Sequence, residues 1–244
     1  MCNETIIEEK AQQSLEIIEN AVDGIEKICI GYSSGKDSDL AKHFLCKVRP
    51  DAIPVYCNTT VEAKESLVHA RKLPNLVEIH PDVNFWWCVD KYGLPKMKGK
   101  SKVYRGNACC YFLKEKPMKL WIRDNNPDIL VDGLTLAESH QRAMALSRDG
   151  VFHYVKTWNV AKLHPIYRWK PDEVLYYLRK NKIPYNPKYD TGSNRIGCIT
   201  CTAFKNWDCV MNREYPKLYQ KIVAIMQENE GQKNLNEYHQ EKYK

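Results

Sequence analysis

The sequence predicts an α/β protein built on a parallel, twisted sheet flanked by helices. Three short apolar stretches, at residues 28–32, 52–57 and 129–134, have the length and composition of buried strands. Each is followed by residues in which apolar side chains recur at helical spacing. Strands that alternate with helices in this way predict βαβ units, whose strands run parallel.

The remaining elements follow from the same two periodicities and from turn residues. In the first half of the chain we expect an amphipathic helix at 4–22, a helix beginning near residue 37, a helix at 61–71 and a short strand at 76–79. In the second half we expect a helix opening at residue 109, a helix beginning near residue 138, a last strand at 164–169, a helix at 172–180 and a C-terminal helix at about 214–229. No internal repeat or linker is visible. We therefore expect one domain over residues 1–244, with its core at about 25–212, and a C-terminal helix and tail at 213–244.

Composition and charge narrow the classes of function. The net charge of +7 suits a phosphate-rich ligand and permits contact with RNA or DNA, although many soluble proteins are equally basic. Five basic residues within 96–105 indicate either a lid over phosphates or a plain solvated loop. No apolar run is long enough to span a bilayer, and no signal peptide is evident, so we expect a cytoplasmic protein without membrane contact.

The stretch after the first strand is the strongest candidate for a ligand site. It reads Ser33-Ser34-Gly35-Lys36-Asp37-Ser38 and joins a buried strand to a helix. Such a turn aims free backbone N–H groups and the helix dipole at an anion, and Lys36 adds a mobile positive charge. It is not a Walker A loop, because the glycine spacing is shorter and Asp37 rather than Ser or Thr follows the lysine. An ordinary strand-to-helix turn is the competing interpretation.

Polar residues after two other strands extend this candidate site. Ligands of parallel sheets lie beyond the carboxyl ends of the strands. Asn58 and Thr59 follow the second strand, where they could contact a ribose or base, or could instead cap the next helix. Glu138 and Arg142 follow the strand at 129–134; they are spaced to form a surface ion pair, but their position favours a role at the ligand.

Cysteines form a second constellation. In a chain without a secretion signal, ten cysteines indicate metal or redox chemistry rather than a disulfide framework. Two pairs stand out, the adjacent Cys109 and Cys110 and the spaced Cys198 and Cys201, with Cys209 eight residues further on. Four thiolates from two segments fit a structural zinc site or a [4Fe–4S] cluster, and free thiols remain the competing interpretation. Adjacent cysteines are awkward ligands for a single zinc ion, since they splay apart in extended chain.

The loop and the cysteines together resemble a known family. Residues 33–38 are similar to the PP-loop, Ser-Gly-Gly-Lys-Asp-Ser, of the adenine nucleotide α-hydrolase superfamily, with Ser34 where its first glycine is usual. The whole pattern resembles the phosphoadenosine phosphosulfate (PAPS) reductase family over roughly residues 27–209. The stretches that carry the resemblance are the loop, Cys109-Cys110 with Lys114 and Pro117, Gly133 with Glu138-Ser139 and Arg142, His164-Pro-Ile-Tyr-Arg-Trp169, and Asn186-Pro-Lys-Tyr189 leading to Arg195-Ile-Gly-Cys-Ile-Thr-Cys201.

The resemblance implies a PP-loop α/β fold with a C-terminal cysteine-rich segment, an adenine nucleotide and sulfur chemistry. It implies nucleotide binding by residues 33–38, Asn58, Thr59, Gly133, Glu138 and Ser139, with catalytic roles for Lys36, Asp37 and Arg142. The cysteine pattern is similar to that of the cluster-bearing adenosine phosphosulfate (APS) reductases, which implies a [4Fe–4S] cluster on Cys109, Cys110, Cys198, Cys201 or Cys209, with Zn²⁺ as the alternative.

Two departures separate this chain from those reductases. They have a degenerate PP-loop, whereas residues 35–38 here are intact, and they have a nucleophilic cysteine in a C-terminal motif that this tail lacks. Both favour ATP cleavage between the α and β phosphates in the service of sulfur transfer, with Mg²⁺ bound beside Asp37. Within the family, the chain looks closer to the enzyme of DNA phosphorothioation, which keeps the ATP-type loop together with an iron–sulfur cluster, than to an assimilatory reductase. The alternatives are an APS or PAPS reductase, which forms sulfite, and a non-catalytic nucleotide-binding regulator with a zinc site. The partners implied are ATP or a sulfonucleotide, a tRNA or DNA acceptor, a sulfur- or electron-donor protein, and a second copy in a homodimer.

Overall fold

Six strands form one sheet at the centre of the chain. The computed structural model describes residues 4–95, 107–193, 196–204 and 206–228. The strand order is β3-β2-β1-β4-β6-β5. The strands are β1 (Ile28–Tyr32), β2 (Ile53–Cys57), β3 (Val77–Ile79), β4 (Ile129–Val131), β5 (Phe152–Val155) and β6 (Val160–Leu163). All neighbours pair in parallel except β5, which runs antiparallel to β6 at the edge. The predicted α/β class with a mainly parallel sheet is therefore confirmed.

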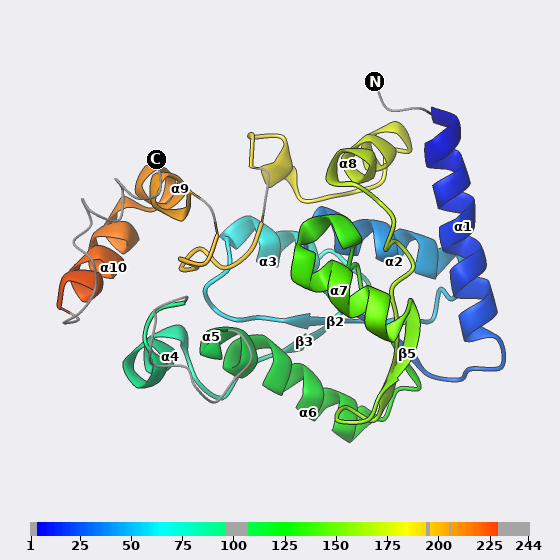
Figure 1. Cartoon of the computed structure of the whole chain (residues 1–244), viewed down its shortest axis with the longest axis horizontal. Coiled ribbons are helices and arrows are strands. Elements are labelled where there is room, and N and C mark those ends of the chain that lie inside the picture. The colour runs from blue at the N-terminus through cyan, green and yellow to red at the C-terminus, as the bar shows by residue number, and fades with distance from the viewer. Residues whose placement is uncertain (1–3, 96–106, 194–195, 205, 229–244) are drawn as a thin grey trace.

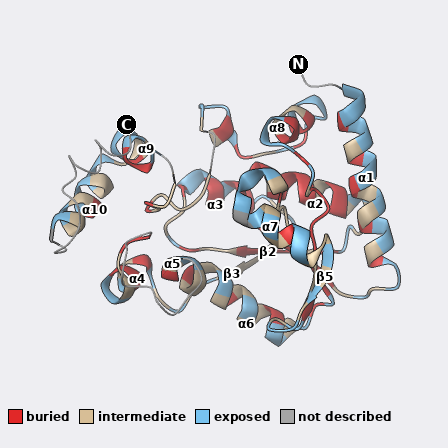
Figure 2. Cartoon of the chain, viewed as in Figure 1, coloured by how far each residue is buried: buried red, intermediate tan, exposed pale blue. Residues whose placement is uncertain are grey.

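Successive side chains of a strand point to opposite faces of the sheet, and the apolar residues of these strands are buried on both faces. Ile28 and Ile30 of β1 belong to a core shared with α1 (Glu4–Val22), α2 (Lys36–Val48) and α8 (Pro171–Lys180). Cys29, between them, belongs to a core on the other face, against α6 (Lys116–Asn125). The sheet thus lies between two helical layers (Figure 1), and its central strands are buried (Figure 2).

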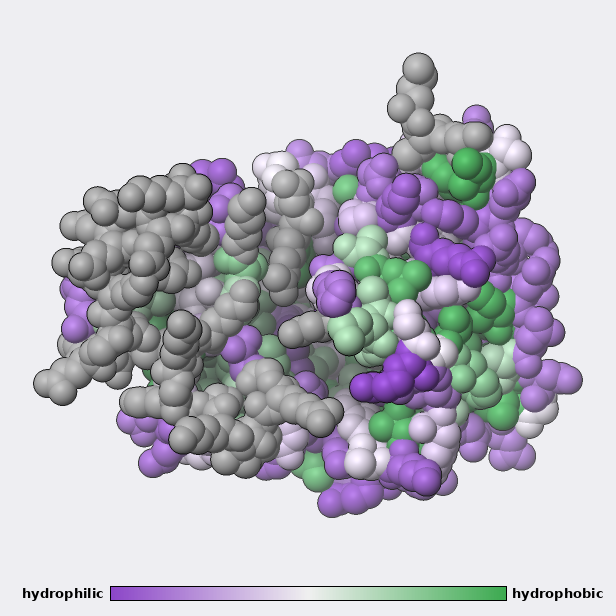
Figure 3. Space-filling model, in the orientation of Figure 1, coloured by the Kyte–Doolittle hydropathy of each residue, from purple (hydrophilic) through white to green (hydrophobic). Residues whose placement is uncertain are grey.

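A third cluster lies at the far end of the molecule. It is formed by α4 (Phe85–Tyr92), α5 (Ala108–Cys110), the π-helical turn Tyr111–Glu115, α9 (Trp207–Glu214) and α10 (Pro216–Glu228), with Trp207 and Leu113 fully buried in it. The remaining helical elements are α3 (Lys64–Ala70), α7 (His140–Asp149) and two short 3-10 turns, Leu136–Glu138 and Pro187–Tyr189. Within the described residues no helix is long and apolar enough to cross a membrane. On the face that carries α7 and β5, apolar patches are interspersed with polar surface (Figure 3).

The structure corrects two expectations. The last strand is not residues 164–169, which form turns, but β6 just before them, and it pairs with the unpredicted β5. The helix after β2 begins at Lys64 rather than at residue 61. The C-terminal helix expected at about 214–229 is confirmed as α10, Pro216–Glu228, and an unpredicted helix, α9, precedes it. The basic segment 96–105, Arg195 and the tail at 232–244 lie outside the described residues.

Candidate functional site

The sheet changes its direction of growth between β1 and β4. The chain moves from β1 through β2 to β3 on one side, then returns to place β4 on the other side of β1. Beyond the carboxyl ends of strands at such a switch point, the two following loops diverge and leave room for a ligand. Residues 33–35 follow β1 and Gly133 follows β4 within two residues, so the topology brings both predicted nucleotide-binding stretches to this edge.

The Ser38 hydroxyl organises the loop from within. Its Oγ accepts hydrogen bonds from the backbone N–H groups of Ser33 (3.3 Å) and Gly35 (3.1 Å) and donates to the Gly35 carbonyl (2.8 Å). It also lies 3.2 Å from the Ser33 hydroxyl. The loop is therefore closed on itself, and two of its amides are occupied by Ser38 in this structure.

Ser34 has the left-handed backbone conformation that explains why glycine is usual at its position. Its φ is +61°, a region that side chains with a Cβ rarely adopt. Its hydroxyl is fully buried and donates to the Ser66 carbonyl (2.8 Å), and the Asn186 amide contacts both the carbonyl (3.3 Å) and the hydroxyl (3.4 Å) of Ser34. Buried hydrogen bonds thus offset the backbone strain that the serine introduces.

Lys36 is not the exposed, mobile charge that the sequence predicted. Only 5% of the residue is accessible, and its ammonium group contacts both carboxylate oxygens of Asp37, at 2.6 and 2.7 Å. Asp37 retains more accessible surface, 19% of its side chain. The two predicted catalytic charges of the loop therefore neutralise each other, and a phosphate or a metal ion would have to share or replace this pairing.

Gly133 packs directly against the beginning of α2. A Cβ built at this position would lie 2.7 Å from the carbonyl carbon and oxygen of Asp37 and 2.8 Å from the Ser38 nitrogen. Real Cβ atoms essentially never approach backbone so closely. Only glycine lets the loop after β4 pack against the PP-loop, which assigns Gly133 a clear structural role; contact with a nucleotide stays a prediction.

Glu138, Ser139 and Arg142 lie together at the start of α7. Arg142 forms an ion pair with Glu138, and its backbone N–H donates to the Ser139 hydroxyl (3.2 Å), which caps the helix. Side-chain accessibilities are 47% for Arg142 and 31% for Glu138. The ion pair expected from the spacing is thus present, and the half-exposed guanidinium lies at the same edge of the sheet as the loop.

Asn58 and Thr59 fold back onto the protein. Asn58 accepts from the Thr60 N–H (3.0 Å) and donates to Glu78 (2.8 Å), and neither residue caps α3, whose N-cap is Ala63. The helix-capping alternative is therefore wrong. Thr59 is fully buried, with its hydroxyl 4.0 Å from the Cys198 sulfur, so it faces the cysteine segment. Their predicted contact with ribose or base stays a prediction.

Four of the five predicted metal ligands lie within electrostatic reach of one another. A hydrogen bond with Cys110, burial, and the charges of Cys110, Cys198 and Cys201 all raise the pKa of Cys109. Burial raises the pKa of Cys198, and Cys110 and Cys201 raise it further. Cys209 lies exposed on α9. The structure thus brings together thiols from the two separated pairs.

A lysine–carboxylate pair lies beside these thiols. The Lys114 ammonium is 3.2 Å from Glu62, and the backbone of Glu62 forms a β-bridge with Cys198. Burial lowers the pKa of Lys114, but the Cys198 thiolate and Glu62 act in the opposite direction, and the net shift is upward. The Lys114 ammonium is partly exposed and lies beside Glu62 and the Cys198 segment, where a cation would stabilise a thiolate.

The cysteine donor set has the ligand chemistry of either a zinc site or an iron–sulfur cluster. Tetrahedral zinc with bonds of about 2.3 Å needs sulfurs about 3.8 Å apart. Among the described residues no group of three or more Cys, His, Asp or Glu side chains is arranged for a single metal ion. The [4Fe–4S] cluster and its zinc alternative therefore both stay predictions.

A family comparison now decides the classification. The model of the phosphoadenosine phosphosulfate reductase domain matches residues 27–204. The chain belongs to the PAPS reductase family. The fold expected from that resemblance, a PP-loop α/β fold, is confirmed as well: a PAPS reductase from Candida auris, solved with phosphate, superposes with a TM-score of 0.57 at 16% identity, covering 81% of this chain and 96% of that one.

Members and neighbours of the family differ in what they do. An APS reductase of Staphylococcus haemolyticus is 30% identical over 73% of this chain and 71% of its own length. An uncharacterised protein of Methanocaldococcus jannaschii is 29% identical over 96% of this chain, which spans only about half (49%) of that relative. The U34-tRNA thiolase NcsA of Methanococcus maripaludis, solved with its [4Fe–4S] cluster, has a TM-score of 0.54 at 17% identity, covering 91% of this chain and 79% of that one.

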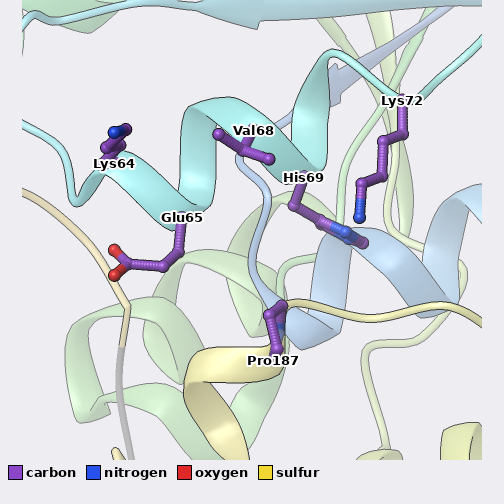
Figure 4. Close-up of a pocket in the computed structure, with 6 residues that line it drawn as sticks. All are labelled: Lys64, Glu65, Val68, His69, Lys72 and Pro187. Carbon is purple, nitrogen blue, oxygen red and sulfur yellow. The ribbon is translucent and has the colours of Figure 1, made fainter.

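Sequence reasoning missed a buried carboxylate beside the family's loop. Asp39, only 1% exposed, accepts hydrogen bonds from His69 (2.9 Å) and from Tyr32, and its second oxygen has no partner among the described atoms. Burial raises the pKa of Asp39. The neighbouring His69 lines a pocket of about 210 Å³ between α3 and Pro187 (Figure 4). None of the predicted nucleotide-binding residues lines this pocket.

A second missed pair lies directly before Gly133. Asp132, the last residue before that glycine, accepts a hydrogen bond from His164 (2.6 Å). Burial alone would raise the pKa of Asp132, but the His164 contact lowers it below its usual range. Because the two residues are 32 positions apart, no local sequence pattern pointed to them.

Proposed function

We propose that this chain binds ATP at residues 33–38 and cleaves it between the α and β phosphates to activate an acceptor for sulfur transfer. The acceptor oxygen attacks the α phosphorus, the bond to the bridging oxygen breaks, and pyrophosphate leaves. A hydrosulfide-level nucleophile then displaces AMP from the adenylated acceptor. The observation that carries the proposal is the intact loop, with a lysine, a carboxylate and a hydroxyl at the amino end of a buried helix.

Each charged group of the loop has a role in this reaction. Lys36 would neutralise charge that develops on the departing pyrophosphate, once its contact with Asp37 is exchanged for a phosphate oxygen. The Asp37 carboxylate, thereby released, would bind the Mg²⁺ that accompanies ATP. Arg142, half-exposed at the same edge, would hold a phosphate or an anionic acceptor.

The cysteines complete the proposal. Cys109, Cys110, Cys198 and Cys201 would hold a [4Fe–4S] cluster, whose role when bound is to join the two segments or to deliver sulfur. The tRNA thiolase among the structural neighbours supports a nucleic-acid acceptor such as tRNA, with DNA as the alternative. A separate sulfur-donor protein and a homodimer remain part of the proposal.

A second candidate is sulfonucleotide reduction. The similarity to an APS reductase over most of the chain favours it. It requires a thiolate that attacks sulfur and is later released by an external thiol. With four cysteines assigned to a cluster, the exposed Cys209 is the first candidate for that nucleophile.

ATP turnover and binding separate these candidates. We expect anaerobically purified protein to release AMP and pyrophosphate, to bind ATP more tightly than APS or PAPS, and to form no sulfite from either in the presence of thioredoxin. Robust sulfite production, abolished by Cys209→Ser, would replace the first proposal with the second. Nucleotide binding with no turnover and stoichiometric zinc would favour the non-catalytic regulator.

Two matched substitutions locate the sites. Lys36→Ala should weaken ATP binding roughly 10- to 100-fold, as expected for the loss of a hydrogen bond from a charged group, whereas Lys47→Ala, exposed on the same helix, should not. Cys198→Ser should lower iron and sulfide content, whereas Cys209→Ser should leave both intact. Equal ATP affinities in the two lysine variants, or loss of iron in Cys209→Ser, would contradict these assignments.

A further inference from the structure

A tyrosine distant in sequence occupies the first amide of the helix that begins at the PP-loop. The Tyr189 hydroxyl accepts a hydrogen bond from the Lys36 backbone N–H at 3.2 Å. Lys36 is the first residue of α2, and the N-cap Gly35 has no side chain to cap that helix. Tyr189 is 7% exposed, so the contact is buried inside the protein.

This amide is one that an anion at the loop would use. The first N–H groups of a helix have no partner within the helix and are the groups that bind phosphate at helix amino ends. One N–H donates at full strength to only one acceptor. A phosphate at this amide and the Tyr189 oxygen therefore compete for the same N–H group.

The segment that carries Tyr189 is anchored on both sides. Asn186, fully buried, donates to Ser34 in the loop and to the Ser66 hydroxyl (3.3 Å) on α3. Lys188 forms an ion pair with Glu214 (2.8 Å) and a hydrogen bond with Tyr215 (3.1 Å) at the end of α9. The 3-10 turn Pro187–Tyr189 thus connects the loop to the C-terminal helices that pack around the cysteine pair.

We propose that Tyr189 is a latch that holds the PP-loop in its unliganded form and is displaced from the Lys36 amide when phosphates bind. The inference rests on the proposed nucleotide site and adds a residue that tunes its affinity. Displacement disturbs the 3-10 turn, and the contacts of Lys188 convey the change to α9. Nucleotide occupancy is in this way reported to the end of the molecule that contains Cys109.

Tyr189→Phe tests the latch, because it keeps the ring and removes only the competing oxygen. We expect ATP and inorganic pyrophosphate to bind about 2- to 10-fold more tightly by calorimetry, the range expected for one net hydrogen bond. Tyr185→Phe is the matched control. The Tyr185 hydroxyl donates to Asp190 (2.7 Å) in the same segment and accepts from Arg179 (3.1 Å), and it makes no hydrogen bond with the described residues of the loop. Tyr185→Phe should leave both affinities unchanged.

Amide hydrogen exchange tests the latch both without and with nucleotide. In the unliganded protein, Tyr189→Phe should speed exchange of amides within 33–39, and Tyr185→Phe should not. In the wild type, ATP should slow exchange within 33–39 and speed it within 186–190. Unchanged or weaker ligand affinity in Tyr189→Phe, with binding intact in the wild type, overturns the latch alone. If the wild type binds neither ligand, the proposed function fails. Unchanged exchange within 33–39 in unliganded Tyr189→Phe, compared with the wild type, overturns the latch whether or not nucleotide binds.

Discussion

Replacing Gly133 with alanine would force a methyl group into the backbone of the PP-loop. The new Cβ would lie 2.7 Å from the Asp37 carbonyl group and 2.8 Å from the Ser38 nitrogen. Ordinary carbon contacts are about 3.5–4.0 Å, so the overlap approaches 1 Å. All three opposing atoms belong to the backbone, and no side chain can rotate away. Either the loop after β4 or the first turn of α2 must shift, at a cost of about 1–3 kcal/mol for overpacking.

Urea unfolding and ATP calorimetry would measure the two consequences of Gly133→Ala. We expect lower stability by about 2 kcal/mol and weaker ATP binding, since the displaced atoms begin the helix that receives the phosphates. Gly31→Ala is the control, because its Cβ would meet Leu130 at 3.6 Å and Met118 at 3.9 Å, which are ordinary contacts. Gly133→Ala with the stability and ATP affinity of the control would refute the assigned close packing.

Three further predictions concern buried polar contacts. Ser34→Ala and Ser34→Gly both lose the buried hydroxyl, but only the alanine variant keeps the strained φ. We therefore expect Ser34→Gly to be more stable to urea than Ser34→Ala, by about 0.5–1 kcal/mol in the free energy of unfolding. The reverse order would mean that the strain is negligible. Asn186→Ala leaves Ser34 and Ser66 without its amide and should cost about 1–3 kcal/mol, measured in the same way. His164 holds the pKa of Asp132 below its ordinary value of 3.8, so the pair stabilises the fold above that pH and loses its effect as the pH falls. The urea midpoint of the wild type should therefore fall between about pH 5 and 3, and it should fall less in Asp132→Asn. The same pH dependence in both proteins would disprove the linkage.

Periodicity was sufficient for the parts of the fold that are long or deeply buried. The helix at Glu4–Val22 matches its prediction because its apolar stripe and the Asp23-Gly24 stop both act locally. The strand predicted at 164–169 was wrong, because Ile166 and Trp169 are fully buried yet belong to turns. Burial alone does not distinguish a strand from a buried turn. The edge strand β5 alternates in exposure, but Phe152 and Tyr154 lie on its exposed side, so its sequence does not show the usual pattern of apolar residues inside and polar residues outside.

In the candidate site, too, features encoded by neighbouring residues could be predicted, and features that depend on contacts between distant segments could not. The loop was predictable because its signal, a strand followed by small residues and a lysine, is contiguous. That Lys36 is buried against Asp37 was not predictable, since burial depends on the packing of distant segments around the loop. Tyr189 reaches Lys36 across 153 positions, and Asn186 reaches Ser34 across 152. No single-sequence pattern encodes those contacts.

The π-helical turn Tyr111–Glu115 sets the rotational phase of the cysteine pair. Each residue of an α-helix advances about 100° around its axis, and a π turn accommodates one additional residue between flanking helical segments. Cys109 and Cys110 precede this turn, whereas Ile122 after it anchors α6 on the sheet. Because the wide turn absorbs that residue, deleting one residue from Tyr111–Glu115 would leave a regular α-helix with the cysteines on the same face. Deleting a second residue would rotate the cysteines by about 100° relative to the anchored face. The segment therefore holds one residue more than the orientation of the thiols requires.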